Sequence, residues 1–258
     1  MSSAHNTPIL ELDHVGFQYS RDKPCIDNLT FSIGNGELIG LLGANGSGKS
    51  TILKLASGIL KPSKGTIKLW GKTLPSYKNR DRAKLLCYLP QLLDINAPFK
   101  VRELVAMGLY PYDIPPELNI HEALEMVGLQ DKSESHITHL SGGERRRAFI
   151  AMTLLQGAGI LLLDEPLANL DIKYQLEIQR LLKELKEKKN ISVIMALHDI
   201  NIAFQFEKIM LMKDGKIIRI GAPAEVLTKN LLKEALDVNV EMIKIESGET
   251  YISYKNNS

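Results

Sequence analysis

The sequence predicts an α/β fold with a mainly parallel β-sheet, an antiparallel β subdomain and an inserted α-helical subdomain. Three short runs dominated by apolar residues predict the parallel sheet, and they lie at residues 38–42, 160–163 and 191–197. Such runs are typical of strands that are buried on both faces of a sheet.

An apolar stripe with helical spacing separates the second run from the third, and lysines and glutamates fill its other face. The stripe consists of Tyr174, Ile178, Leu181, Leu182 and Leu185. A strand, a helix and a strand in this order favour a right-handed crossover between parallel strands.

The two ends of the chain carry the signals of a second, antiparallel part. Residues 9–19 alternate loosely and predict an edge strand, with which residues 29–33 are expected to form a hairpin. Near the C-terminus, residues 222–236 predict a helix, and residues 238–254 predict short strands that close the fold.

The middle of the chain differs from both ends. Residues 98–157 carry helical patterns around 101–107, 121–127 and 141–155, with little strand signal. We therefore expect a single domain over residues 1–258, in which residues 1–90 and 158–258 form the α/β core and residues 91–157 form the helical subdomain.

The composition excludes several classes of function. Hydrophobic residues make up 44% and charged residues 24% of the chain, as in an ordinary soluble globular protein. The net charge is only +2 and no basic run stands out, which argues against a nucleic-acid-binding protein. Cys25 and Cys87 are far apart, so they predict no disulfide framework and no zinc site, and they fit a reducing cytosol.

No segment is expected to enter a membrane. Residues 1–6 are polar and lack the apolar core of a signal peptide. The apolar stretches are far shorter than the about 20 residues that cross a bilayer. Any function at a membrane would therefore need a partner that supplies the span.

The strongest local signal follows the apolar run at residues 38–42. It fits the phosphate-binding pattern G-x-x-x-x-G-K-[ST] and consists of Gly43, Ala44, Asn45, Gly46, Ser47, Gly48, Lys49, Ser50 and Thr51. Glycines let main-chain N–H groups point at phosphate oxygens, and the following helix adds its positive end. Lys49 is expected to contact the β and γ phosphates, and the Ser50 hydroxyl is expected to ligate Mg²⁺. The pattern therefore predicts an ATP site on a P-loop NTPase core.

Two carboxylates end the run at residues 160–163. A strand that ends in Asp164 and Glu165 places both at the edge of the sheet where ligands of α/β proteins bind. We expect Asp164 to belong to the Mg²⁺ sphere and Glu165 to polarise the attacking water as general base. Alone, such a pair is also common as an acidic turn after a strand.

A third motif is Leu140-Ser141-Gly142-Gly143-Glu144. Ser141 and Glu144 fit a capping box at the start of a helix. A capping box does not call for two glycines in the first turn, where each weakens a helix by about 1 kcal/mol relative to alanine. Bare N–H groups that approach a phosphate closely would explain Gly142 and Gly143. A second phosphate cradle in one chain indicates a γ-phosphate shared between two copies.

With these motifs in this order, the chain resembles the ABC ATPase family over residues 9–240, nearly its whole length. The resemblance implies that two copies meet head to tail and clamp ATP between the Gly43 loop of one and the Ser141 turn of the other. It also implies membrane permease subunits as partners, an indirect substrate-binding protein, no nucleic acid, and a place on the cytoplasmic face of the membrane.

The resemblance assigns four further residues. Tyr19 matches an aromatic residue that stacks on adenine, although a tyrosine packed in the sheet is the alternative. Gln91 matches the glutamine that contacts Mg²⁺ and the attacking water. Asp171 matches an aspartate that acts across the dimer, although it equally suits a plain helix N-cap. His198 matches the histidine that senses the γ-phosphate.

The chain departs from the family pattern at a few positions. Leu167 and Ala168 replace a frequent threonine and serine, and Arg146 lies where glutamine is common. His136 and His139 are close enough to bind a metal ion, but a solvated loop is the simpler reading.

Residues 101–108, 197–203 and 221–228 resemble the subfamily that imports iron-siderophores, haem and cobalamin. Leu109 departs from the subfamily pattern, because arginine is common at this position. The segment 112–120 is also shorter than the corresponding segment of the subfamily. An exporter subunit, or a non-transport ABC ATPase acting on ribosomes or DNA, are the alternatives. The second of these usually has two fused domains or a coiled-coil insertion, and this chain has neither.

Two apolar clusters near Gln91 predict where a membrane subunit docks. The clusters consist of Leu92, Leu93, Ile95, Pro98 and Phe99, and of Met107, Leu109, Tyr110 and Tyr112. An apolar cleft rimmed by polar residues suits a docked helix, and packing back into the core is the alternative.

Overall fold

The computed structural model describes residues 8–20, 25–91, 98–244 and 250–255. The chain divides into two compact units, of which the first comprises Met1–Thr73 with Ile194–Ser258 and the second Leu74–Val193. Three of the hydrophobic members of the predicted docking clusters, Leu92, Leu93 and Ile95, lie outside the described residues.

The first unit contains an antiparallel sheet of four strands. Its order is β2 (Ile26–Ile33), β1 (Leu10–Phe17), β4 (Lys64–Leu69) and β5 (Lys72–Thr73). The predicted hairpin of β1 and β2 is confirmed, but the prediction of an edge strand is wrong, because β1 also pairs with β4 along its other side. A bulge near His14 breaks the alternation of β1, so the loose pattern reflected an irregular strand and not an edge.

The parallel strands of this unit lead to the phosphate-binding motif. The predicted strand at residues 38–42 is β3 (Leu38–Gly43), and every one of its residues is buried. It pairs in parallel with β9 (Lys208–Lys213), which in turn pairs with β10 (Lys216–Gly221) in the antiparallel sense. After β3 the chain turns through the loop 44–48 into α1 (Lys49–Ser57), whose inner face is buried.

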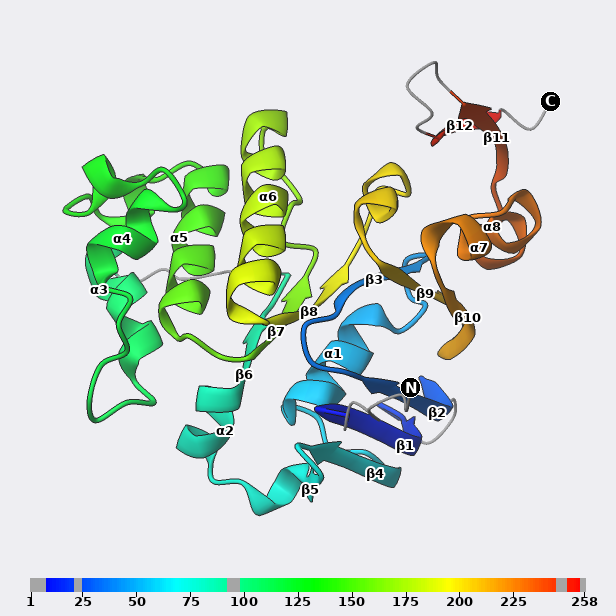
Figure 1. The fold of residues 1–258 in the computed structure, drawn as a ribbon, viewed down its shortest axis with the longest axis horizontal. Helices are drawn as coiled ribbons and strands as arrows, with labels where there is room; N and C mark the ends of the chain where they lie inside the picture. Colours follow the sequence, from blue (N-terminus) through cyan, green and yellow to red (C-terminus); the bar gives the residue numbers. More distant parts are fainter. Residues whose placement is uncertain (1–7, 21–24, 92–97, 245–249, 256–258) are drawn as a thin grey trace, which may run out of the picture. The chain divides into compact units, whose positions relative to one another are not determined.

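The C-terminal part of the first unit is mixed. The predicted helix at residues 222–236 is two helices, α7 (Pro223–Val226) and α8 (Lys229–Leu236). The break arises because the Thr228 side chain accepts a hydrogen bond from Leu231 N and thereby starts a new helix. The predicted short strands are the hairpin of β11 (Asn239–Lys244) and β12 (Thr250–Lys255), at the red end of Figure 1.

The second unit begins with η1 (Leu74–Ser76) and α2 (Asn79–Leu85), which lead to a parallel pair of strands. These are β6 (Leu86–Leu89) and β7 (Ile160–Asp164), and β7 confirms the buried run at residues 160–163. Helix α6 (Ile172–Lys189) follows, and of the predicted stripe it buries Ile178, Leu182 and Leu185. Strand β8 (Ser192–Ala196) confirms the third run and crosses the boundary between the units.

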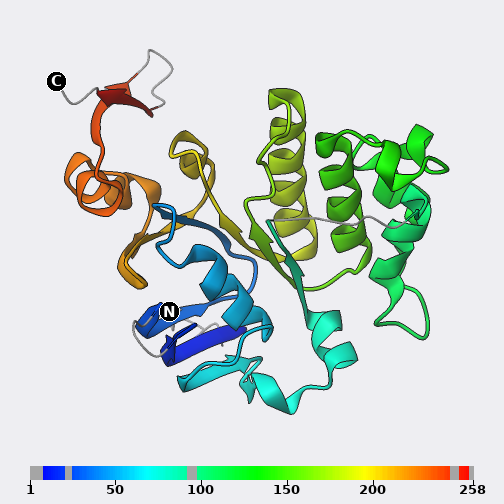
Figure 2. The same ribbon diagram turned by 180° about the vertical axis from the view of Figure 1, so that it is seen from behind.

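The rest of the second unit is helical, as the patterns predict. It comprises α3 (Val101–Ala106), η2 (Met107–Leu109), α4 (Ile120–Glu125), η3 (Gln130–Lys132), η4 (Ile137–His139) and α5 (Gly142–Leu155). Helices α3, α4 and α5 lie side by side in both views (Figures 1 and 2). At Gly108 a Cβ would lie 2.4 Å from Met152 O, so glycine allows η2 to pack directly on α5.

Among the helices of the described ranges, none combines the length and the apolar character that crossing a bilayer requires.

Candidate functional site

The loop between β3 and α1 has the backbone geometry that a phosphate cradle needs. Gly46 and Gly48 have φ values of 80° and 103°, which glycine adopts without strain. Gly48 is the N-cap of α1, where no side chain caps the helix and no acidic residue occupies the first turn. No acidic side chain of the first turn therefore opposes an anion at this end of α1, and the helix dipole favours one.

Two polar side chains of this motif, Ser47 and Lys49, are buried. Lys49 is 6% exposed, and its Nζ donates hydrogen bonds to Gly43 O at 2.7 Å and Ala44 O at 3.2 Å, so the ammonium lies inside the curl of the loop. The buried Ser47 Oγ finds no hydrogen-bond partner in the described part of the chain. A buried cation and an unsatisfied hydroxyl in one loop fit the phosphates of a nucleotide, because a phosphate oxygen would accept a hydrogen bond from Ser47 and would carry the charge opposite to that of Lys49.

Tyr19 lies beside the same motif. It follows the end of β1, is 64% exposed, and shares a hydrogen bond of 3.2 Å with Thr51 Oγ1. Its ring meets that of Phe17 edge to face. The alternative of a tyrosine packed in the sheet is therefore wrong, and an exposed ring near α1 leaves the adenine contact as a prediction.

His198 is exposed and follows β8 by two residues. Leu197 N donates a hydrogen bond of 2.9 Å to Leu41 O, which aligns the end of this segment with β3. The structure thus places His198 at the edge of the sheet where β3 enters the phosphate-binding loop.

In the second unit, the two carboxylates end β7 as predicted. Asp164 is 1% exposed, and its Oδ2 accepts a hydrogen bond from Tyr88 OH at 3.2 Å. Glu165 has a φ of 50°, and its Oε2 accepts a hydrogen bond of 2.8 Å from Gln91 Nε2. Two of the predicted catalytic side chains, 74 residues apart in the chain, therefore meet.

Arg146 is a residue of this site that sequence reasoning missed. Its side chain reaches the segments of Gln91 and Glu165 from the second turn of α5, and it is 7% exposed. Burial lowers the pKa of the guanidinium, while the carboxylates of Glu165 and Asp164 oppose that shift. The signal that could have found it is three consecutive arginines at the start of a helix that is otherwise largely apolar.

The turn at Ser141 is a capping box, as predicted. Ser141 N donates to Glu144 Oε2 at 2.9 Å, and Glu144 N donates to Ser141 Oγ at 3.2 Å. A Cβ on Gly142 would meet nothing within 4 Å, and one on Gly143 would lie 3.4 Å from Asn169 O. Neither glycine has a positive φ. Packing in the described chain therefore does not require glycine at 142, which leaves room for close approach from outside.

Asp171 is the N-cap residue of α6, but its side chain makes no capping hydrogen bond. The simple capping alternative is therefore weakened, and a role at a dimer interface stays a prediction. His136 and His139 stack edge to face, and the described residues contain no cluster of three or more potential metal ligands.

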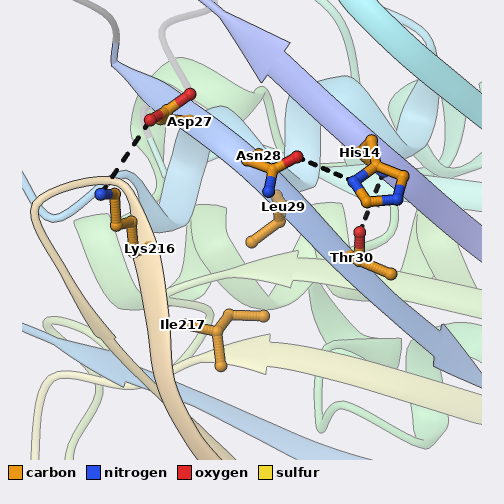
Figure 3. Close-up of a pocket in the computed structure, with 7 residues that line it drawn as sticks. All are labelled: His14, Asp27, Asn28, Leu29, Thr30, Lys216 and Ile217. Atoms are coloured by element: carbon orange, nitrogen blue, oxygen red, sulfur yellow. Dashed lines mark hydrogen bonds and ion pairs between the residues drawn. The ribbon is translucent and has the colours of Figure 1, made fainter.

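A pocket of about 520 Å³ lies elsewhere in the first unit. Figure 3 shows the His14 ring facing the Asn28 amide and Lys216 reaching toward Asp27. His14 Nδ1 and Asn28 Oδ1 are 2.8 Å apart. None of the residues that line it belongs to the phosphate-binding loop.

A glycine-rich phosphate cradle after a buried strand, and a second buried strand that ends in Asp164 and Glu165, define a P-loop ATPase. Comparison with known proteins carries this further. The model of the ABC transporter family matches residues 26–168, more than half of the chain. The chain belongs to the ABC transporter family and is an ATP-binding ATPase.

Two relatives show what the chain resembles. It is 39% identical over 227 residues to the petrobactin import ATP-binding protein FpuC of Bacillus anthracis, covering 85% of this chain and 84% of the relative. It is 37% identical over 242 residues to the iron(3+)-hydroxamate import ATP-binding protein FhuC of Bacillus subtilis (strain 168), covering 91% of this chain and 90% of the relative.

Two solved structures share the fold. A chain of an inward-facing ABC transporter superimposes with a TM-score of 0.80 at 24% identity, covering 97% of this chain and 98% of its own. A dimeric ATP-binding cassette bound to ADP and phosphate in a post-hydrolysis state superimposes with a TM-score of 0.75 at 25% identity, covering 83% and 98%.

Proposed function

We propose that this chain is the ATPase subunit of an importer of a metal chelate, namely an iron-siderophore, haem or cobalamin. The observation that carries the catalytic part is the hydrogen bond between Gln91 and Glu165 at the end of a buried strand. The names of the two relatives, a petrobactin import protein and an iron(3+)-hydroxamate import protein, support the direction of transport and the class of substrate.

The chemistry follows from the residues on each unit. Lys49 and the N–H groups of the loop 43–51 bind and orient the phosphates of ATP. Ser50, Asp164 and Gln91 would hold Mg²⁺ through their side-chain oxygens, and the ion would neutralise charge that develops on the phosphates. Glu165 takes the proton of the attacking water, and Gln91 orients Glu165 through its amide. His198 contacts the γ-phosphate, and Tyr19 stacks on the adenine.

The assembly we propose is a head-to-tail pair in which Ser141, Gly142, Gly143 and Asp171 of one copy complete the ATP site of the other. Open space at the Gly142 Cβ position and the unused capping capacity of Asp171 support this. The pair would bind permease subunits on the cytoplasmic face of a membrane, and through them act with a substrate-binding protein.

The general base is tested by Glu165→Gln. Glutamine is nearly isosteric and can still accept the Gln91 hydrogen bond, so ATP binding should be unchanged. Hydrolysis should slow by about 10²–10⁴-fold, as for a lost general base, and an ATP-bound dimer should accumulate in gel filtration. Single-turnover hydrolysis and ATP-binding titrations measure the two effects.

Glu177→Gln is the matched control, because it makes the same chemical change at an exposed position on α6. It should hydrolyse ATP at the wild-type rate. If Glu165→Gln also does so, Glu165 is not the base.

A further inference from the structure

The guanidinium of Arg146 binds four main-chain oxygens in the second unit. Nε donates to Pro166 O at 2.8 Å, and Nη1 donates to Gln91 O at 2.9 Å. Nη2 donates to Asp164 O at 3.1 Å and also to Glu165 O. One side chain thus joins helix α5 to the segment of Gln91 and to the segment of the proposed base.

This arrangement is costly as a purely structural device. A buried charge is unfavourable unless it is paired and hydrogen-bonded, and the hydrogen bonds described for this guanidinium go to neutral carbonyls. A helix that only had to pack on its neighbouring helices and on β6 could use an apolar side chain at this position. The forked, planar donor set instead suits a role in which several carbonyls must be held at fixed mutual positions.

The segment that it holds is under backbone strain. Glu165 has a φ of 50°, which a residue with a Cβ adopts at a cost and keeps only where surrounding contacts impose it. Arg146 contacts the carbonyl before Glu165, that of Glu165 itself and the one after it. The same guanidinium contacts the carbonyl of Gln91, whose side chain donates to Glu165.

We propose that Arg146 is a positioning residue for ATP hydrolysis, which holds the main chain at Gln91 and Glu165 so that their side chains meet in the geometry that activates water. The proposal rests on Glu165 being the general base. Arg146 also lies five residues after Ser141, the N-cap residue of α5, so it connects the turn that we assign to the partner's nucleotide with this chain's own base.

Arg146→Lys tests the proposal. Lysine keeps the positive charge but replaces the fork with a single ammonium, which cannot span carbonyls on both segments. We expect kcat to fall by about 10–100-fold, because small displacements of catalytic groups have effects of this size, with the KM for ATP nearly unchanged. Should the lysine variant not fold, Arg146→Gln, which removes the buried charge and keeps one amide donor, is measured in its place.

Arg147→Lys is the matched control. Arg147 is the next residue of α5, is equally buried, and donates to Val127 O at 2.8 Å while its guanidinium lies 3.5 Å from the centre of the Tyr174 ring. Its contacts do not reach Gln91 or Glu165. This variant should lower the melting temperature but leave the kcat of the folded protein close to wild type.

The double variant Arg146→Lys with Glu165→Gln separates positioning from general destabilisation. If Arg146 acts through Glu165, the lysine substitution should change the residual hydrolysis of Glu165→Gln by less than about twofold, since interacting sites are not additive. A wild-type kcat in folded Arg146→Lys would overturn the proposal, as would a full 10–100-fold loss that persists in the Glu165→Gln background. A failure of the proposed base shows separately, as unimpaired turnover in Glu165→Gln alone.

Discussion

The sequence identifies the residues of the proposed site to different degrees, and these residues are Glu165, Gln91 and Arg146. Glu165 follows an apolar strand and an aspartate, so its local context identifies it. Gln91 is recognised by its place in a family pattern. Arg146 lies in a run of three arginines, and only its burial and its carbonyl partners distinguish it from its neighbours in that run. The residues to which we assign contacts with the reacting atoms are therefore easier to identify from the sequence than the residue that we propose positions them.

The stabilisation of the folded protein by the Glu144 carboxylate depends on pH. The pKa of its carboxyl is lowered mainly because Ser141 N donates a hydrogen bond to it, with smaller contributions from the Ser141 side chain, Lys132 and Arg147, while burial opposes the shift. The folded pKa lies below the unfolded value of about 4.3, so the stabilisation is present above that pH and is lost as the pH falls through the folded pKa.

Glu144→Gln should therefore be less stable than wild type at pH 7 by about 0.3–1 kcal/mol, the usual scale for a charge at a helix N-terminus. The difference should shrink as the pH falls below about 4. Urea unfolding at pH 7 and at pH 4 and below measures it, with Glu177→Gln as the exposed control. A deficit that stays constant over this range would show that the charge of Glu144 does not stabilise α5.

At the scale of elements, the predicted docking cluster at η2 and the residues after it contains both exposed and packed side chains. Tyr112 packs against the protein, because its hydroxyl donates a hydrogen bond to Gln156 O at 2.7 Å and burial raises its pKa. Tyr110 is 76% exposed and Met107 is 42% exposed, whereas Leu109 is half-buried. The structure thus leaves Tyr110 and Met107 as the surface on which a permease helix could dock.

Tyr110→Asp should leave ATP binding and basal hydrolysis unchanged, because Tyr110 contacts none of the proposed catalytic residues. It should abolish co-purification with the permease and any stimulation of turnover by substrate. Co-expression with the permease, followed by affinity purification from membranes, measures the first effect.

Leu176→Asp is the control for Tyr110→Asp. Leu176 is 56% exposed on α6 and lies outside the predicted docking cluster. If Tyr110→Asp still binds the permease at full yield, the docking surface lies elsewhere.

At the scale of the whole molecule, the proposed pair of subunits is tested by complementation. Lys49→Ala removes the proposed phosphate contact, and Ser141→Arg blocks the turn that would complete the partner's site, so each protein alone should be inactive. In an equimolar mixture, half of the random pairs are mixed and each has one intact site, so about a quarter of wild-type activity should return. Steady-state ATP hydrolysis of the mixture measures this.

The control mixture combines Lys49→Ala with Glu165→Gln. In the head-to-tail arrangement, each ATP site takes both Lys49 and Glu165 from the same chain. One site of the mixed pair therefore lacks Lys49 and the other lacks Glu165, so neither site is intact. This mixture should stay inactive. Rescue in both mixtures, or in neither, would contradict a site shared through Ser141.

The local sequence determined the buried strands β3, β7 and β8, the phosphate-binding loop, the capping box at Ser141 and the helical middle of the chain. Each depends on the spacing of residues within about a dozen positions, which local propensity and periodicity report directly. The break between α7 and α8 also has a local cause, because Thr228 caps α8. The apolar periodicity continues across this break and therefore predicted a single helix.

Tertiary structure decided the rest. It placed β4 on the second side of β1, brought the Gln91 side chain to Glu165, and buried Arg146 against carbonyls 18 to 55 residues away in the chain. These contacts join segments whose own patterns carry no information about each other. Their free energy comes from burial and hydrogen bonding between distant segments, so they exist only once the chain has folded.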